Sequence, residues 1–307
     1  MKYETAGDPV SGLRWTRKTT EKIADELLAL DIRVSRKTVA KLLKQNNFSL
    51  RTNKKKISNG SPPERDAQFA TIAQLRERFG QRGNPILSVD TKKRELVGRF
   101  KNPGRVWARQ SDAVNDHDFR SMAKGVAIPY GIYDLQCNRG TVYVGTSYNT
   151  PQFAVECIEK WWRTEGQKRF PDRRHLLVLA DTGGSNGATC RAWKHGIQHK
   201  LCNEHGLRVT VAHYPPGASK WNPIEHRLFS EISKNWAGRP LDSYETVLNF
   251  IRTTKTKTGL KVNVRLVKKQ YAKGIKISDP AMAVLNLKRP TSLPKWNYTL
   301  RPSKNGK

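Results

Sequence analysis

Apolar positions near the start of the chain follow the spacing of α-helices. Between residues 16 and 45, apolar side chains recur at three- and four-residue intervals on either side of a polar break at Asp31–Ser35. Ser35 stands where its hydroxyl can cap the second helix. The pattern predicts two short helices joined by a turn. This is the layout of a helix-turn-helix, and equally that of an ordinary helical hairpin.

The middle of the chain alternates between apolar strands and amphipathic helices. Three β-rich runs come first, and then a continuous apolar run and a further strand follow, separated by helices. The predicted strands are 85–90, 128–135, 140–147, 174–181 and 207–214, and the predicted helices are 67–79, 151–166, 188–205 and 222–236. Three sequential strands indicate an antiparallel meander, and the later alternation indicates a parallel βαβ half. This order predicts an α/β fold with a ribonuclease-H-like mixed sheet and flanking helices.

Composition divides the chain into four parts. Residues 51–66 are basic and rich in Ser, Asn and Pro, which is typical of a linker. We therefore predict a small all-α helix-turn-helix domain at 1–50, a basic linker at 51–66, and the α/β domain at 67–240. Residues 241–307 hold one helical pattern, short strands and many lysines, and are predicted to form a basic C-terminal extension.

The net charge of the chain indicates which class of partner it binds. Of the 307 residues, 57 are Lys or Arg and 26 are Asp or Glu, so the formal net charge is +31. Such an excess attracts polyanions, of which nucleic acid is the commonest. A hydrophobic content of 36% and 8 tryptophans indicate a packed core rather than a basic tail. The charge favours a helix-turn-helix that binds DNA, and its second helix carries four basic residues: Arg36, Lys37, Lys41 and Lys44.

The sequence shows no sign of a membrane or secretory location. No apolar run is long enough to span a bilayer, and residues 1–12 do not form a signal peptide. The four cysteines are scattered without a CxxC pair. These features predict a cytoplasmic protein in a reducing compartment, without a membrane partner.

Three acidic residues stand at the ends of predicted elements. Asp90 and Asp181 each end an apolar strand, and Glu225 lies at the start of the helix after the last strand. Active sites of mixed α/β sheets lie beyond the carboxyl ends of strands, so neighbouring strands would bring these acids to one crevice. Three carboxylates at one point repel each other unless a cation neutralises them, and all-oxygen sites favour Mg²⁺ or Mn²⁺. A pair of such ions is suited to phosphodiester chemistry.

Each of these acids also has a purely structural alternative. Strand-terminal aspartates often cap turns. Glu225 follows Asn222 and Pro223 at the spacing of a capping box, in which it would only bond the cap residue. Asp134 also ends a strand and is the best substitute for a member of the trio, although a turn is its expected role. All three acids at matching ends of the sheet, in so basic a protein, favour catalysis.

A run of cysteines and histidines makes zinc a further alternative. Its potential ligands are Cys190, His195, His199, Cys202 and His205, with the first two histidines on one helical face. The spacing fits no common zinc pattern, and the segment is typical of an amphipathic helix. Zinc is therefore disfavoured.

Three segments carry a resemblance to a known family. Taken together, "SVDTKK", "ADTGGSNG" and "HYPPGASKWNPIEHRLFS" resemble a bacterial insertion-sequence transposase of the DDE class, closest to the Rhodopirellula-type DDE transposase family. The resemblance runs from "GLRWTRKTTEKIADEL" to "WNYTL" and so covers almost the whole chain. The "WNPIE" element is also similar to the step that carries the third acid in mariner-like transposases. Members of the family generally have further sequence before the helix-turn-helix, so the resemblance predicts a fragment or a shortened copy.

The resemblance implies an activity and its partners. It implies a ribonuclease-H-like core in which Asp90, Asp181 and Glu225 work with two Mg²⁺ (or Mn²⁺) ions to cut the element's end. The freed 3′-hydroxyl then attacks target DNA. The helix-turn-helix would recognise terminal inverted repeats, and the protein would act as a homo-oligomer on DNA, associated with the bacterial nucleoid. The lysines that flank two of the acids are predicted to hold phosphates: Lys92, Lys93 and Lys220.

Two other functions remain open on the sequence. One is a catalytically inert DNA-binding regulator derived from a truncated transposase. The other is a ribonuclease-H-like nuclease that uses the same acids without strand transfer. All three functions predict DNA binding that weakens steeply with salt.

Overall fold

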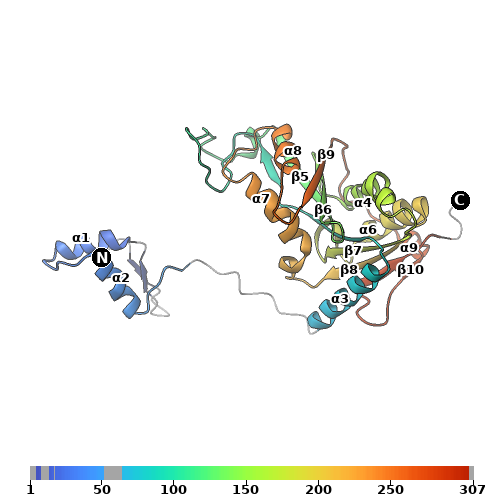
Figure 1. Ribbon diagram of the computed structural model, residues 1–307, viewed down its shortest axis with the longest axis horizontal. Coiled ribbons are helices and arrows are strands. Elements are labelled where there is room, and N and C mark those ends of the chain that lie inside the picture. Colours follow the sequence, from blue (N-terminus) through green and yellow to red (C-terminus); the bar gives the residue numbers. More distant parts are fainter. Residues whose placement is uncertain (1–4, 8–13, 17, 52–63, 304–307) are drawn as a thin grey trace. The chain divides into compact units, whose positions relative to one another are not determined.

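The computed structural model describes residues 5–7, 14–16, 18–51 and 64–303. The chain divides into two compact units, residues 1–58 and 59–307 (Figure 1). No helix in these described ranges is long and apolar enough to cross a membrane.

The N-terminal unit contains the two helices that the sequence predicts. They are α1 (Thr20–Leu28) and α2 (Arg36–Gln45), and the Ser35 hydroxyl accepts a hydrogen bond from the backbone N–H of Thr38 at the start of α2. Two short strands, which the all-α prediction did not include, form an antiparallel pair: β1 (Thr5–Gly7) and β2 (Arg14–Thr16). The four basic residues of α2, Arg36, Lys37, Lys41 and Lys44, are all exposed.

The larger unit is built on one mixed sheet, shown in Figure 1. The sheet has nine strands in the described residues, in the order β10-β11-β8-β7-β3-β5-β6-β9, with β4 paired to β5. The bounds are β3 (Ile86–Thr91), β4 (Glu95–Val97), β5 (Gly125–Asp134), β6 (Arg139–Gly145), β7 (His175–Asp181), β8 (Arg208–Tyr214), β9 (Lys261–Val267), β10 (Leu287–Lys288) and β11 (Asn297–Leu300). Strands β3, β5 and β6 form an antiparallel meander, and β3, β7 and β8 run parallel. The predicted ribonuclease-H-like mixed sheet is confirmed.

Helices flank this sheet. The α-helices are α3 (Arg65–Gln81), α4 (Pro151–Trp161), α5 (Gln167–Arg169), α6 (Arg191–Ile197), α7 (Ser230–Asn235), α8 (Tyr244–Arg252) and α9 (Asp279–Ala283). Wider π-helical turns cover Trp162–Gly166, Gln198–Asn203 and Glu225–Phe229, and 3₁₀ turns cover Arg120–Met122, Gly184–Asn186 and Ser219–Trp221. Thr150 caps α4 by accepting from the Phe153 N–H, with Pro151 at the first helical position.

Both faces of the sheet are covered, which explains its uninterrupted apolar strands. Helices α4 and α6 pack on one face, where Trp161, Trp162 and Trp193 are wholly buried. On the other face, α3 packs over β3, β7 and β8, while α7, α8 and the π turn before α7 pack over β5, β6 and β9. Central strands buried on two sides have no polar-facing positions to break their apolar run.

The segment 241–307, which the sequence analysis set apart as a basic extension, contributes strands to both edges of the sheet. Strand β9 pairs in parallel with β6, and β11 pairs antiparallel with β8. In β9, the exposed Lys261 and Asn263 alternate with the buried Val262. That alternation is the pattern of a half-buried edge strand, which the surrounding lysines obscure in the sequence.

Candidate active site

Strand pairing brings two of the predicted acids together. Asp90 lies near the end of β3 and Asp181 ends β7, and these strands are adjacent and parallel, with Val89 opposite Ala180. Both aspartates line one cavity of about 420 Å³, together with Asn149 and the loops at 182–186 and 215–217. The cavity lies at the carboxyl ends of the parallel strands, where sites of such sheets are found.

The third acid, Glu225, stands close to this pair without lining the cavity. It opens the π-helical turn Glu225–Phe229 that follows β8, and π turns inside helices are frequent at functional sites. In the described ranges, no three His, Cys, Asp or Glu side chains converge closely enough to hold one ion. The convergence of all three carboxylates on one point stays a prediction.

Electrostatics nevertheless couple the three carboxylates. Burial, the Asp181 charge and the Glu225 charge raise the pKa of Asp90 to about 8, against a lowering by the Thr91 N–H, which donates to Asp90 Oδ1 at 2.7 Å. Burial also raises the pKa of Asp181. Burial and the Asp181 charge raise the pKa of Glu225, while Lys92 opposes the rise. Burial, and for Asp90 and Glu225 the neighbouring carboxylates, thus disfavour the charged forms, and the oxygen donors of the site suit Mg²⁺ or Mn²⁺.

A buried bridge connects the three elements that carry the acids. The Asn222 side chain, 0% exposed, donates from Nδ2 to Asp181 Oδ1 at 3.1 Å and accepts from the Ser88 hydroxyl. Ser88 Oγ in turn accepts the backbone N–H of Ile224 at 3.1 Å. Asn222 therefore orients Asp181 rather than capping its own helix. The N–H of Ile224, at the helix start, is satisfied by Ser88 of the neighbouring strand.

Close approach of the Glu225 helix to the sheet depends on a glycine. Gly131 of β5 pairs with Asp90 in register. A Cβ at Gly131 would lie 2.5 Å from a Phe229 ring carbon and 2.8 Å from Ile224 Cδ1. Only glycine therefore allows the helix to pack this closely beside Asp90.

Sequence reasoning missed two residues that hold the acids in place. Ser88 lies two positions before Asp90 on β3, so both side chains face the same side of the strand. His213, 0% exposed, donates from Nδ1 to the backbone carbonyl of Asp181 at 2.9 Å. Burial lowers the pKa of His213 to about 4, which keeps it neutral. The sequence signal that could have identified them is a polar residue inside a largely apolar strand, Ser88 in β3 and His213 in β8.

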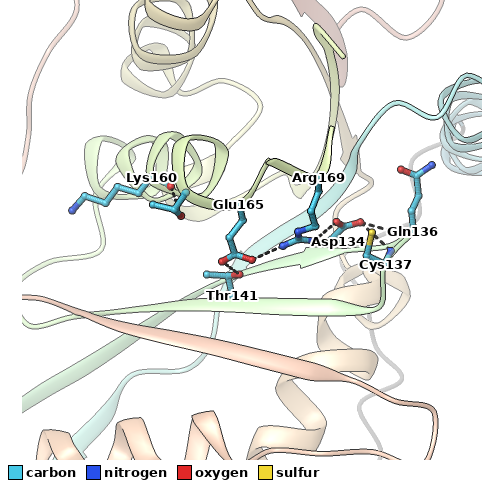
Figure 2. Close-up of polar contacts among 8 residues, drawn as sticks. Asp134, Gln136, Cys137, Thr141, Lys160, Glu165 and Arg169 are labelled. Carbon is cyan, nitrogen blue, oxygen red and sulfur yellow. Dashed lines mark hydrogen bonds and ion pairs between the residues drawn. The ribbon is translucent and has the colours of Figure 1, made fainter. Parts of the chain in front are cut away.

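Asp134 lies at the opposite end of the sheet and belongs to a structural network, shown in Figure 2. Its carboxylate, 0% exposed, pairs with Arg169 Nη1 at 2.6 Å and accepts the backbone N–H groups of Gln136 and Cys137. Arg169 also pairs with Glu165. The expected turn role of Asp134 is confirmed, and it does not substitute for a member of the trio.

The predicted phosphate-binding lysines differ in their surroundings. Lys92 Nζ lies 3.1 Å from Glu95 Oε1 and 4.5 Å from the Trp236 ring centroid, and its side chain is only 10% exposed. Lys93 and Lys220 are exposed, and Lys220 lies over the Trp221 ring. The structure therefore leaves Lys93 and Lys220 accessible to phosphate and gives Lys92 a partner within the protein.

The cysteine and histidine run forms a packed helix. The rings of His195 and His199 lie 4.3 Å apart between centroids, while Cys202 is fully buried in the core. Within the part of the chain described here, these side chains are not grouped to hold a metal.

The chain is similar to known proteins in sequence and in structure. A family model described as "Rhodopirellula transposase DDE domain" matches residues 1–302. Among solved structures, the Mos1 transposase paired-end complex with left transposon end is similar at 16% identity, with 76% of this chain and 65% of that chain covered and a TM-score of 0.46. The Mos1 strand transfer complex is similar at 16% identity, with 76% and 64% covered and a TM-score of 0.47. The chain thus spans about two thirds of the length of these Mos1 chains. No curated protein matches it.

Proposed function

Because the chain belongs to the Rhodopirellula transposase DDE domain family, we propose that it is a DNA transposase whose site is formed by Asp90, Asp181 and Glu225. The observation that carries this proposal is the pair of strand-end aspartates that face one cavity on adjacent parallel strands. Glu225 raises the pKa of Asp90 and so belongs to the same charge cluster.

We propose that two divalent cations, Mg²⁺ or Mn²⁺, bind at this site. Asp90 and Asp181 would hold them, with Glu225 as the further ligand, because carboxylate oxygens are preferred by these ions. When bound, the ions supply the positive charge that the attacking and leaving oxygens of a phosphodiester require. The protein itself contributes orientation: Asn222 and Ser88 fix Asp181, and the Thr91 N–H fixes Asp90.

The DNA partners follow from the rest of the chain. Helix α2, with its exposed Arg36, Lys37, Lys41 and Lys44, is the element proposed to recognise the terminal inverted repeats in the major groove. Lys93 and Lys220 are proposed to hold phosphates next to the cavity. The protein is proposed to act as a homo-oligomer on paired ends, with target DNA as the second substrate.

One assay tests the proposal. The purified protein is incubated with duplex DNA that carries the element's ends, a target plasmid and Mg²⁺, and the products are separated on denaturing and native gels. Nicks at the element end together with joined end–target products support a transposase. Nicks without joined products would instead indicate a nuclease, and DNA binding without either product would indicate an inert regulator.

Metal binding is expected to depend on pH through Asp90. A raised carboxyl pKa means that the metal-free folded protein holds this proton more tightly than the unfolded chain. Its stability therefore falls as pH rises from the unfolded value near 4 through about 8. Mg²⁺ competes with that proton, so its apparent affinity should increase on the order of tenfold between pH 6.5 and 8.5.

The measurement is the Mg²⁺ concentration that half-saturates the rise in melting temperature at each pH. Asp90→Asn, which cannot lose a proton, should show little Mg²⁺-dependent rise at either pH. Equal half-saturating concentrations for the native protein at both pH values would contradict the assignment of Asp90.

Asn222→Ala is expected to lower cleavage without preventing folding. The substitution removes the donor that orients Asp181 and leaves the Ser88 hydroxyl without its acceptor. Losing such an outer partner of a metal ligand typically costs about 10- to 100-fold in activity or metal affinity. The cleavage rate is measured against Mg²⁺ concentration, with the exposed Asn263→Ala on β9 as control. Identical Mg²⁺ dependence in both variants would show that Asn222 does not position the site.

A further inference from the structure

A groove rich in arginine lies at the other end of the sheet. Two cavities of about 580 and 210 Å³ adjoin there, since both are lined by Arg78, Thr210, Thr299 and Arg301. They run between α3 and the edge formed by β8, β11 and β10; Figure 1 shows α3 beside that edge. We call this the arginine groove and define it by its six cations: Arg78, Arg82, Arg208, Lys288, Arg289 and Arg301.

The positive charge of the arginine groove is not neutralised within the protein. No Asp or Glu lines either cavity, and none of the six cations forms an ion pair within the described ranges. The nearest acid on α3, Glu77, is exposed and accepts a hydrogen bond from Gln81. Like charges held together without counter-charge repel, so an anion in the groove would be stabilised.

Two further observations indicate that these cations face a common space. The Nε atom of Arg301 is buried and has no hydrogen-bond partner in the described structure. Burial, followed by the charges of Arg208, Arg82 and Arg301, lowers the pKa of His175, which lines the smaller cavity. A buried unpaired guanidinium nitrogen is costly unless a ligand satisfies it.

The chemistry of the groove suits phosphodiesters. Guanidinium groups offer paired donors that match phosphate oxygens. The floor carries the hydroxyls of Thr210 and Thr299, 3.0 Å apart on neighbouring strands, which are further donors of the kind that contact DNA backbones. The cations come from α3, from the start of β8 and from the segment around β10 and β11, so they are too widely spread for one phosphate.

The arginine groove is separate from the carboxylate cavity. Arg208 begins β8 opposite His175, which begins β7, whereas Asp181 ends β7. Seven residues of extended strand span about 20 Å, so the two sites lie at opposite ends of the sheet.

We propose that the arginine groove binds the sugar–phosphate backbone of a DNA segment held about 20 Å from the carboxylate cavity. This proposal rests on DNA being the substrate of the protein. The row of cations would anchor DNA without reading its sequence, since backbone contacts carry no base information.

The test is the salt dependence of DNA binding by the double variant Arg82→Gln/Arg208→Gln. Its control, Arg163→Gln/Arg252→Gln, removes the same charge from residues outside the groove. Binding of an end-containing duplex is followed by fluorescence anisotropy from 50 to 300 mM salt, without Mg²⁺. Each lost phosphate contact reduces the slope of log K against log[salt] by about 0.9, so the groove variant should lose about 2 and the control much less.

The remaining outcomes separate the alternatives. The melting temperature of the groove variant should equal or exceed that of the native protein, because repulsion in the groove is relieved. A slope equal to that of the control overturns the proposal. A second result also overturns the proposal: inorganic phosphate raises the melting temperature of the native protein but not of the groove variant, while DNA binding is the same for both. The groove would then bind free phosphate instead of DNA.

Failure of the groove proposal and failure of the transposase proposal are distinguishable. Binding is measured without metal and without cleavage, so the groove is tested even if no strand is cut. The converse result is a groove variant that cleaves and joins DNA at saturating DNA concentration and keeps an unchanged salt slope. That result would support the transposase proposal and contradict only the groove proposal.

Discussion

Asp181→Asn is expected to abolish DNA cleavage and joining while DNA binding is retained. Asparagine keeps the shape of the side chain and an oxygen that can accept from Asn222 Nδ2, so the fold and the bridge to Ser88 should persist. It removes one of the two negative charges that face the cavity. Loss of a cation ligand at the reacting phosphate costs at least about 4 kcal/mol of transition-state stabilisation, or roughly 1,000-fold in rate.

The measurement is the initial rate of nicking of end-containing DNA at saturating Mg²⁺, alongside the dissociation constant for the same duplex. Asp172→Asn is a matched control, since Asp172 is exposed and outside the cavity. A rate for Asp181→Asn within tenfold of the control would remove Asp181 from the catalytic site. Weakened DNA binding would point instead to a structural role.

Arg169→Ala is expected to destabilise the protein by about 3–5 kcal/mol. Asp134 is 0% exposed and its Oδ2 lies 2.6 Å from Arg169 Nη1, so removal of Arg169 leaves a buried carboxylate without its counter-charge. Breaking a buried ion pair from one side costs this much because the remaining charge stays desolvated. Glu165, which shares Arg169 and accepts from Thr141, would lose its partner as well (Figure 2).

Urea unfolding followed by circular dichroism measures the effect. Arg163→Ala is the control, because Arg163 lies in the same helical segment, is exposed, and pairs with Glu159 at 3.5 Å. An exposed ion pair of this kind contributes less than about 1 kcal/mol to stability. Asp134→Asn/Arg169→Ala should recover part of the loss, since the unpaired charge is gone. Equal midpoints for Arg169→Ala and Arg163→Ala would show that the network contributes no more than a surface pair.

The central strands and helices of the α/β unit could be predicted because each has a distinct local sequence pattern. A continuous apolar run predicts β7, a largely apolar run predicts β8, and capping residues predict the start of α4. Strand β9, at one edge of the sheet, and strand β11, next to the other edge, were not predicted as parts of the sheet. Strand β9 alternates exposed and buried positions, and β11 has only four residues. Their partners β6 and β8 lie at least 85 residues away in the chain, so no local pattern places either strand in the sheet.

The sequence alone could not separate the aspartates of the candidate site from the aspartate with a structural role. Asp90, Asp181 and Asp134 all stand at strand ends in the sequence, and nothing local distinguishes them. The direction of the strands distinguishes them. Strand β5 runs antiparallel to β3, so its carboxyl end, with Asp134, lies at the opposite end of the strands from Asp90. There Arg169 neutralises it, whereas in the described part of the chain no basic side chain forms an ion pair with Asp90 or Asp181.

The segment "KWNPIEHRLF" marks the division between sequence and tertiary structure. The sequence by itself determined that a helix begins at Pro223 and that an acid, Glu225, follows within its first turn. Only the tertiary structure decided what Asn222 does. Packing over Gly131 brings the helix start against β3 and β7, so the Asn222 amide bridges Ser88 and Asp181. Helix starts are set by local backbone hydrogen bonding, whereas a side chain's partner depends on which distant strand is packed beside it.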